Sequence, residues 1–358
     1  MVLKKKIIVA ISSCLVLIGA LIGGYVCLSH NKPYFSIIVS SYNYGHYLPQ
    51  TIESILKSSY DNFELIVVND GSTDKTSFIL KQYKNHPKIT IIEHENQGLS
   101  LSRNKAMKIA KGKYFWFVDA DDWIDKQALQ GLYDKTKETS PDIVSFYTSR
   151  VNEHGMFLGM GGYDLLPWKL ENNMDNILTI DDLSVGDLKS YPVTSGKQIY
   201  RREFTLENKI EFPAKTLFED DVFFFHHIFA GARISPFPKM LYYKRAHGGA
   251  ITSDKGKHFD SYVRISQYIW ERTHKYPQHE EKANQISSWY IDGIRGRWWY
   301  LSQERKYKFY PDLLKFKEFI DAQENSSFWN EKRKDFNEFF NSPDTQRFKT
   351  QNEEKIDQ

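Results

Sequence analysis

The stretch "YFWFVDADDW", residues 114–123, places five bulky apolar residues directly before three aspartates. A short apolar run of this kind is typical of a strand that is buried on both faces of a parallel sheet. Carboxylates that lie this close together repel one another, and each resists losing its hydration water. The acidic turn of Asp119, Asp121 and Asp122 therefore predicts either a site for a positive group or an ordinary solvated turn.

Short β-rich runs alternate with helical runs on the N-terminal side of this stretch. Strands are expected at 35–42, 62–70, 88–94 and 113–119, and helices at 47–59, 72–84 and 99–112. This alternation predicts an α/β fold with a mainly parallel central sheet and helices on both faces. Ligands of such folds bind at the carboxyl ends of the strands, where "SSYN", "VND" and "VDADD" converge on one edge.

The chain begins with a long apolar segment. Three lysines, at positions 4 to 6, precede residues 7–28, which carry no charge. As a helix this run reaches roughly 33 Å, enough for a bilayer core. We expect an uncleaved single-pass anchor, residues 1–30, rather than a cleaved signal peptide or a hairpin bent near Gly23 and Gly24. An α/β catalytic domain at 31–253 and a helical C-terminal region at 254–358 follow.

Composition excludes some classes of function. The 358 residues carry a net charge of +3, and no basic tract is joined to base-stacking aromatic motifs, so nucleic acid is not an expected partner. Both cysteines, Cys14 and Cys27, lie in the apolar N-terminal segment. The remaining chain therefore has neither a disulfide framework nor a cysteine-based metal site.

The acidic turn and three further groups of polar residues can each be interpreted as a chemical site or as an ordinary structural feature. Asp119 and Asp121 have the spacing to share Mg²⁺ or Mn²⁺, whereas Asp122 or Asp125 would cap a helix. Asp70 ends a buried strand and caps nothing obvious, so it can accept hydrogen bonds from a nucleobase or ribose. Arg103 begins a helix, where a cation opposes the dipole, so it is directed either at a diphosphate or into a surface salt bridge.

The last group is "FEDDVFFF", in which Glu219, Asp220 and Asp221 lie between aromatic residues. A carboxylate held against aromatic surface loses hydration, which raises its pKa and suits a general base. The alternative is an acidic cluster at a helix N-terminus. No glycine-rich dinucleotide or P-loop motif accompanies these residues.

The motifs as a set are more specific than any one of them. In order, "SIIVSSYNYGHYLPQTIESIL", "FELIVVNDGSTDKT", "NQGLSLSRNKAMKIAKGKYFWFVDADDW", "SGKQIYRREF" and "FEDDVFFF" resemble the family 2 glycosyltransferases of the GT-A fold, over roughly residues 34–253. "KRAHGGAIT" resembles the late donor-phosphate loop of the family, although Ala250 stands where many members have serine. Ser41 replaces a frequent proline, and Asn69 replaces a frequent aspartate.

The resemblance implies a nucleotide-sugar donor, with a UDP-sugar the leading choice, and a glycan or polymer acceptor. Asp70 would bind the nucleobase, and Ser41, Tyr42 and Asn43 would line its pocket. The resemblance also assigns roles around the diphosphate: Asp119 at the ribose or near the metal, Asp121 and His247 on Mg²⁺ or Mn²⁺, and Arg103 and Arg245 on the phosphates. Asp220 would be the general base of an inverting hexosyl or N-acetylhexosaminyl transfer.

Two other functions compete with this interpretation. A catalytically inactive glycan-binding or scaffold module could keep the same fold, although the joint presence of Asp70, Asp121 and Asp220 argues against a decayed site. A phosphatase with Asp119 as nucleophile needs a small hydroxyl residue where Trp123 stands. The style of the motifs resembles bacterial cell-surface polysaccharide enzymes. The lysines before the anchor predict that the catalytic domain lies across the membrane from the N-terminus. Bacterial nucleotide sugars are cytosolic, which conflicts with that topology. We therefore expect membrane association and leave open on which side of the membrane the catalytic domain lies.

Overall fold

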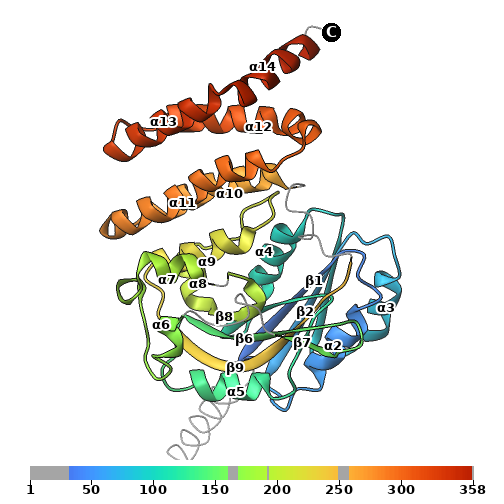
Figure 1. Cartoon of the computed structure of the whole chain (residues 1–358). Coiled ribbons are helices and arrows are strands. Elements are labelled where there is room, and N and C mark those ends of the chain that lie inside the picture. The colour runs from blue at the N-terminus through green and yellow to red at the C-terminus, as the bar shows by residue number, and fades with distance from the viewer. Residues whose placement is uncertain (1–31, 160–167, 192, 249–257, 357–358) are drawn as a thin grey trace, which may run out of the picture.

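The computed structural model describes residues 32–159, 168–191, 193–248 and 258–356 (Figure 1). The predicted membrane anchor at 1–30 lies outside the described residues, and so does the predicted boundary at 253/254. Among the helices that are described, none combines the length and apolarity needed to cross a bilayer.

A nine-stranded sheet forms the centre of the α/β domain, in the order β3-β2-β1-β4-β8-β6-β9-β5, with β7 paired to β6. The four predicted strands are confirmed as β1 (Phe35–Ser41), β2 (Phe63–Asp70), β3 (Ile89–His94) and β4 (Tyr114–Asp119). They pair in parallel, as expected. The remaining strands are β5 (Trp123–Ile124), β6 (Ile143–Val151), β7 (Phe157–Gly159), β8 (Gln198–Arg201) and β9 (Ile234–Arg245).

The second half of the sheet corrects the expectation of a mainly parallel sheet. Strand β8 is antiparallel to both β4 and β6, β5 is antiparallel to β9, and only β6 and β9 run parallel there. An antiparallel neighbour needs no helical crossover, so the strand–helix alternation of residues 34–119 could not indicate it. The sheet is therefore mixed.

Helices cover both faces of the sheet, as predicted. On one face, α2 (Leu48–Leu56), α3 (Thr76–Tyr83) and α5 (Ala128–Thr136) share a core with Tyr114, Trp116 and Val118 of β4. On the other face, α4 (Leu99–Ile109) and α9 (Glu219–Phe229) share a core with Phe115 and Phe117. The uninterrupted apolar run of β4 follows from this burial on both sides.

The C-terminal region is helical, as expected from residue 258 onward. Its helices are α10 (Phe259–Thr273), α11 (Glu280–Trp299), α12 (Gln303–Asp321), α13 (Ser327–Phe340) and α14 (Pro343–Ile356). They stack beyond α9 on the side away from the sheet (Figure 1), and their buried residues belong to the same core as α4 and α9. Shorter helices complete the fold: α6 (Trp168–Glu171), α7 (Val185–Ser190) and α8 (Arg202–Glu207).

Candidate active site

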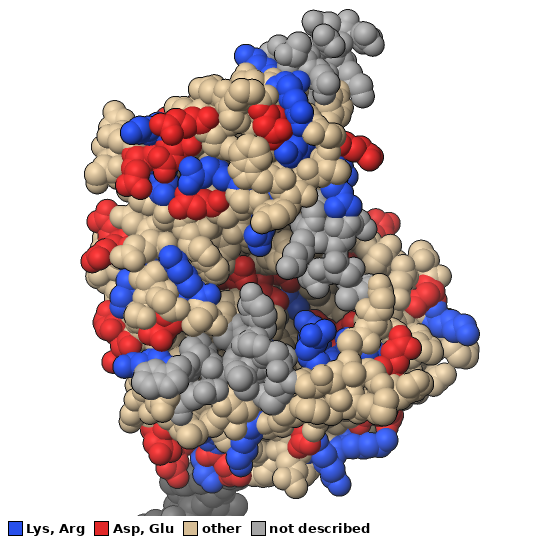
Figure 2. Space-filling model, in the orientation of Figure 1, with Lys and Arg blue, Asp and Glu red and all other residues tan. Residues whose placement is uncertain are grey.

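The carboxyl ends of β1, β2 and β4 meet at one edge of the sheet, as the sequence predicted. In the strand register Ser41 lies beside Asn69, and Ser40 lies beside Asp119. The loops that follow these strands therefore share one surface. Figure 2 shows a hollow near the middle of one face of the molecule, with acidic and basic side chains on its floor.

Asp122 holds the acidic turn in place from inside. Its side chain accepts hydrogen bonds from the Tyr242 hydroxyl (2.7 Å) and from the Arg245 backbone N–H (2.8 Å). The same Tyr242 oxygen accepts from the Asp119 backbone N–H (3.1 Å), so β9 fixes both ends of the turn. Burial raises the pKa of Asp122 well above its ordinary value, and the charges of Asp121 and Asp119 raise it further. Asp122 is thus a buried anchor of the turn.

Asp121 and His247 lie in direct contact at the edge of the turn. The His247 Nε2 atom is 2.8 Å from the Asp121 Oδ2 atom, and the imidazole packs against the Tyr47 ring. Within the described residues, no three histidine, cysteine or acidic side chains form a metal-binding group. One carboxylate and one imidazole fit a cation that takes its other ligands from diphosphate and water, as Mg²⁺ commonly does.

The Arg245 guanidinium is buried against protein acceptors. It donates to the carbonyl oxygens of Asp121 (2.8 Å) and Glu153 (3.0 Å) and to a glutamine side chain. It also lies between the rings of Tyr47 and Trp123, at 4.8 and 4.7 Å from their centroids. These contacts make Arg245 a clamp on the acidic turn, and its contact with a diphosphate stays a prediction.

Arg103 joins the acidic turn to helix α9. Its Nη1 atom is 2.8 Å from Glu219 Oε1 and 2.8 Å from Asp220 Oδ1, and its Nη2 atom is 3.1 Å from Asp119 Oδ1. Burial alone lowers the pKa of Arg103, but the carboxylates of Asp220, Glu219 and Asp119 outweigh this effect and raise it. The residue is 3% exposed, so its ion pairs are buried rather than on the surface, and its contact with a diphosphate stays a prediction.

The three acids at the start of α9 have different environments. Glu219 is 4% exposed, and burial raises its pKa to about 8, with the Asp220 charge adding to the shift and Arg103 opposing it. Burial likewise raises the pKa of Asp221 to about 7, while its carboxylate accepts from the Tyr290 hydroxyl at 2.7 Å. The Asp220 side chain keeps 21% exposure, so its carboxylate stays accessible from outside.

Asp70 is buried at the end of β2 and ties down the loop before α4. Its two carboxylate oxygens accept from the backbone N–H groups of Gln97 and Gly98, each at 2.8 Å. The following Gly71 has φ +71°, and a Cβ atom there would lie 2.5 Å from the Asn96 nitrogen. Glycine is therefore required at this turn. The predicted contact of Asp70 with a nucleobase is untested.

The neighbouring Asn69 has a local explanation. Its Nδ2 atom donates to Glu93 Oε1 at 3.0 Å, and its Oδ1 atom accepts from the Ser72 backbone N–H at 3.1 Å. An aspartate at this position would place a second carboxylate against Glu93. The asparagine therefore suits a strand pair that carries an acid on β3.

The predicted nucleobase-pocket residues lie on the loop after β1. Ser41 is 1% exposed, whereas the Tyr42 ring is 46% exposed. Asn43 has a left-handed backbone with φ 59°, and its side chain accepts from the Thr73 backbone N–H at 2.8 Å. The loops after β1 and β2 are thereby joined, and Tyr42 offers an open aromatic face beside them.

Sequence reasoning missed three residues that shape the site: Thr51, Tyr242 and Tyr290. The Thr51 hydroxyl donates to the carbonyl oxygens of Ala120 (2.8 Å) and Asp122 (2.7 Å). Each of these residues reaches the site across 69 or more positions of sequence. No local pattern indicates such a contact.

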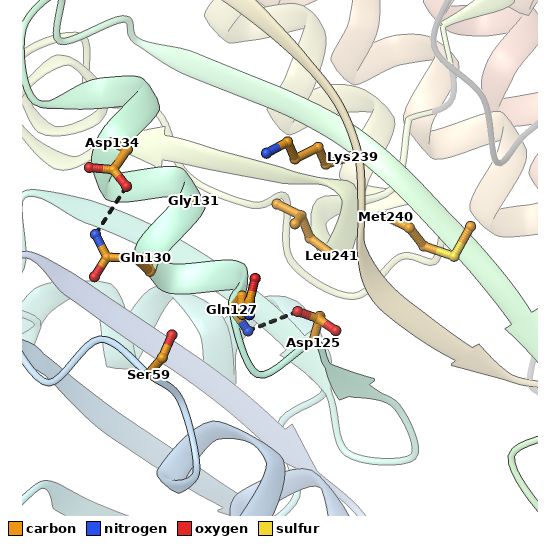
Figure 3. Close-up of a pocket in the computed structure, with 9 residues that line it drawn as sticks. All are labelled: Ser59, Asp125, Gln127, Gln130, Gly131, Asp134, Lys239, Met240 and Leu241. Carbon is orange, nitrogen blue, oxygen red and sulfur yellow. Dashed lines mark hydrogen bonds between the residues drawn. The ribbon is translucent and has the colours of Figure 1, made fainter.

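A separate open hollow of about 660 Å³ lies between α5 and β9 (Figure 3). Its lining residues are Ser59, Asp125, Gln127, Gln130, Gly131, Asp134, Lys239, Met240 and Leu241. None of the predicted site residues is among them. The candidate site is therefore identified by the convergence of strand ends and charges, not by the size of this hollow.

Part of the chain matches a known family. Residues 36–205 match the model of glycosyl transferase family 2. The matched residues, a little under half of the chain, therefore resemble a family 2 glycosyltransferase domain. Asp220, Arg245 and His247 lie beyond the matched residues, so their roles rest on the resemblance of "FEDDVFFF" and "KRAHGGAIT" to the family.

The named relatives of this chain described here are bacterial. Glycosyltransferase GlyA of Streptococcus pneumoniae is 33% identical over 61% of this chain and 31% of its own length. Poly(ribitol-phosphate) beta-N-acetylglucosaminyltransferase TarS of Staphylococcus aureus is 28% identical over 63% of this chain and 37% of its own length. The chain thus spans about a third of the length of these two relatives.

A solved structure shares the fold. The crystal structure of S. aureus TarS 1–349 in complex with UDP-GlcNAc has a TM-score of 0.62 and 23% identity, and the match covers 79% of this chain and 80% of that one. The likeness confirms the GT-A-like α/β fold that the motifs implied.

Proposed function

We propose that this chain is an inverting glycosyltransferase that moves a sugar from a nucleotide-diphosphate sugar, a UDP-sugar by preference, to a hydroxyl of a glycan or cell-surface polymer. The observation that carries the proposal is the sharing of one buried guanidinium by Asp119 and Asp220. Through Arg103, the acidic turn after β4 lies beside the accessible Asp220 carboxylate of α9. Such a pairing suits a donor site with an adjoining general base.

The choice of a UDP-sugar rests on the site and on a structural relative. The exposed Tyr42 ring and the loops joined through Asn43 form an open edge next to Asp70. TarS, which shares the fold, was solved with UDP-GlcNAc. An N-acetylhexosaminyl or hexosyl donor is therefore the first class to test. The poly(ribitol-phosphate) acceptor in the name of TarS makes a cell-surface polymer the first acceptor to test.

The residues divide the reaction between them. Asp220 takes the proton of the acceptor hydroxyl while that oxygen bonds to the anomeric carbon and the bond from this carbon to the diphosphate oxygen breaks. Arg103 fixes the Asp220 carboxylate, and Asp122 and Arg245 fix the turn that carries Asp121. Asp121 and His247 would hold Mg²⁺ or Mn²⁺, which would stabilise negative charge on the departing nucleoside diphosphate.

Membrane association is part of the proposal. The uncharged run at residues 7–28 is long enough for a single span, and three lysines precede it. The full chain should remain with membranes after carbonate extraction, whereas a fragment from Lys32 should be released. Release of the full chain would remove the anchor from the account.

The test of the transferase is Asp220→Asn, which keeps an oxygen that accepts from Arg103 but cannot take a proton. We expect UDP release from UDP-GlcNAc or UDP-glucose, with poly(ribitol phosphate) as acceptor, to fall by about 10²-fold or more. UDP affinity should stay within about twofold of the parent. The matched control is Asp134→Asn, a half-exposed acid on α5, which should leave turnover intact.

Two outcomes would contradict the proposal. Full turnover in Asp220→Asn would remove Asp220 from the base role. Binding of glycan polymers by a parent protein that neither binds UDP nor cleaves UDP-sugars would support the scaffold module instead.

A further inference from the structure

We infer that the C-terminal helical region positions the general base, with Tyr290 of α11 acting through Asp221 on the helical turn that carries Asp220. The inference deepens the proposed function, because it rests on Asp220 as the base of the transfer. Tyr290 is a positioning residue, since its hydroxyl contacts Asp221 rather than the reacting atoms.

The first turn of α9 depends on support from outside the helix. Phe218, which precedes it, has a left-handed backbone with φ 63°, an unfavourable conformation for a bulky residue. Phe218 is also the N-cap residue of α9, and its side chain makes no capping hydrogen bond to the first turn. A conformation of this kind persists where surrounding contacts over-determine it.

Two contacts hold this turn from two different helices. On one side, Arg103 of α4 binds Glu219 and Asp220, each at 2.8 Å. On the other side, the Tyr290 hydroxyl donates to Asp221 Oδ2 at 2.7 Å. In sequence, Asp220 lies between Glu219, which Arg103 of α4 binds, and Asp221, which Tyr290 of α11 binds. The direction of its carboxylate is therefore set by both helices together.

Tyr290 is itself fixed by packing. It is 3% exposed, stacks on the Tyr262 ring at 5.9 Å, and meets Phe225 of α9 edge-on at 6.1 Å. Gly293 leaves the room that Tyr262 needs, because a Cβ atom there would lie 2.4 Å from the Tyr262 hydroxyl oxygen. The Arg297 guanidinium packs over the Tyr262 ring, at 3.7 Å from the ring centroid. The hydroxyl that reaches Asp221 therefore has little freedom to move.

The contact also assigns a task to helices beyond the residues that define the family. The family model ends at residue 205, whereas α10 and α11 begin at Phe259 and Glu280. Both helices belong to the same core as α9. Deleting them would unfold the core, so point substitutions in the full chain are the appropriate test.

The test variant is Tyr290→Phe, which removes one hydroxyl and keeps the ring. Its matched control is Tyr114→Phe, which also removes a buried hydrogen bond, from Tyr114 Oη to the Pro141 carbonyl oxygen at 2.9 Å, at the opposite end of β4. We expect Tyr290→Phe to lower kcat for UDP-sugar cleavage by about tenfold or more, with the donor KM and the UDP Kd unchanged. Asp221→Asn keeps an acceptor oxygen and should retain more turnover than Asp221→Leu.

Amide hydrogen exchange gives a readout that does not depend on activity. The backbone amides of residues 219–222 should exchange faster in Tyr290→Phe than in the parent and in Tyr114→Phe. Equal exchange at these amides in Tyr290→Phe and Tyr114→Phe, or an equal fall in kcat, would overturn the inference and leave a purely structural hydrogen bond. A parent protein without turnover would instead refute the transferase, and hydrogen exchange would still decide whether Tyr290 holds the turn.

Discussion

Replacing Arg103 by methionine tests the central ion cluster most severely. The substitution keeps a long unbranched chain among Phe117 and Phe212 but removes the charge that faces three carboxylates. The Arg103 side chain is 4% exposed, and Glu219 beside it is 5% exposed, so water cannot replace the lost partner fully.

The size of the effect follows from this burial. Removing one partner of a buried ion pair costs about 3–5 kcal/mol, because the other charge is left without compensation. We expect a loss of this order in the free energy of unfolding at neutral pH. The loss should grow between pH 7 and pH 9, because burial raises the pKa of Glu219 to about 8: below that pH the protonated carboxyl needs no cation, and above it a further buried charge is left without compensation.

Urea unfolding followed by circular dichroism at pH 7 and pH 9 measures this difference. Arg264→Met, which breaks an ion pair with Asp260 in which the arginine is 39% exposed, is the matched control and should cost less than about 1 kcal/mol. A loss in Arg103→Met that matches this control, or one that does not depend on pH, would refute the account of the cluster.

Three other substitutions give separate tests. Burial raises the pKa of Asp221 to about 7, so the native state keeps a proton that the unfolded chain loses near pH 4. The contribution of this group to the free energy of unfolding therefore falls as pH rises from 4 to 7. Asp221→Asn should remove that contribution to the slope in unfolding measurements between pH 4.5 and 8. An unchanged slope would contradict the assignment. Thr51→Val removes a donor to two backbone carbonyls of the acidic turn, at 2.8 and 2.7 Å, and should lower the free energy of unfolding by about 1–3 kcal/mol in urea. A loss within error of zero would show that these carbonyls find other donors. Gly112→Ala places a Cβ atom 2.4 Å from the Ser36 nitrogen and should cost about 1–3 kcal/mol, whereas Gly296→Ala meets nothing within 4 Å and should cost nothing; equal thermal midpoints would count against the close approach.

The parts of the fold that depend on local sequence were predictable. The run Tyr114–Val118 is apolar at every position because both of its faces are buried, and that pattern can be recognised without knowledge of the neighbours. Turn residues such as Gly71 mark where strands end. The convergence of Asp70 and Asp119 on one edge followed from the parallel order of β1, β2 and β4.

The parts that depend on distant pairing were not predictable from one sequence. Strands β6 and β9 pair residues about 90 positions apart, as Ile143 does with Ile234, and β8 enters between β4 and β6. The mixed half of the sheet follows from these pairings. The alternating pattern before residue 120 contains no information about them.

The charged residues show the same limit. The sequence predicts phosphate contacts for Arg103, from its place at a helix start, and for Arg245, from the resemblance to the family. In the structure Arg103 contacts carboxylates and Arg245 contacts carbonyl oxygens, which no local pattern indicated, and their contacts with phosphates stay predictions. Glu219, Asp220 and Asp221 are adjacent and similar, yet only the tertiary contacts of Arg103 and Tyr290 distinguish their roles.

The most direct test of the account is calorimetric titration of the full chain in detergent with UDP, with and without Mn²⁺, beside Asp121→Ala and the control Asp134→Ala. The account predicts UDP binding that Mn²⁺ strengthens, that Asp121→Ala abolishes, and that Asp134→Ala leaves unchanged. UDP binding that is indifferent to both Mn²⁺ and Asp121 would contradict the cation site at Asp121 and His247. The absence of UDP binding under every condition would contradict a uridine nucleotide donor at this edge of the sheet.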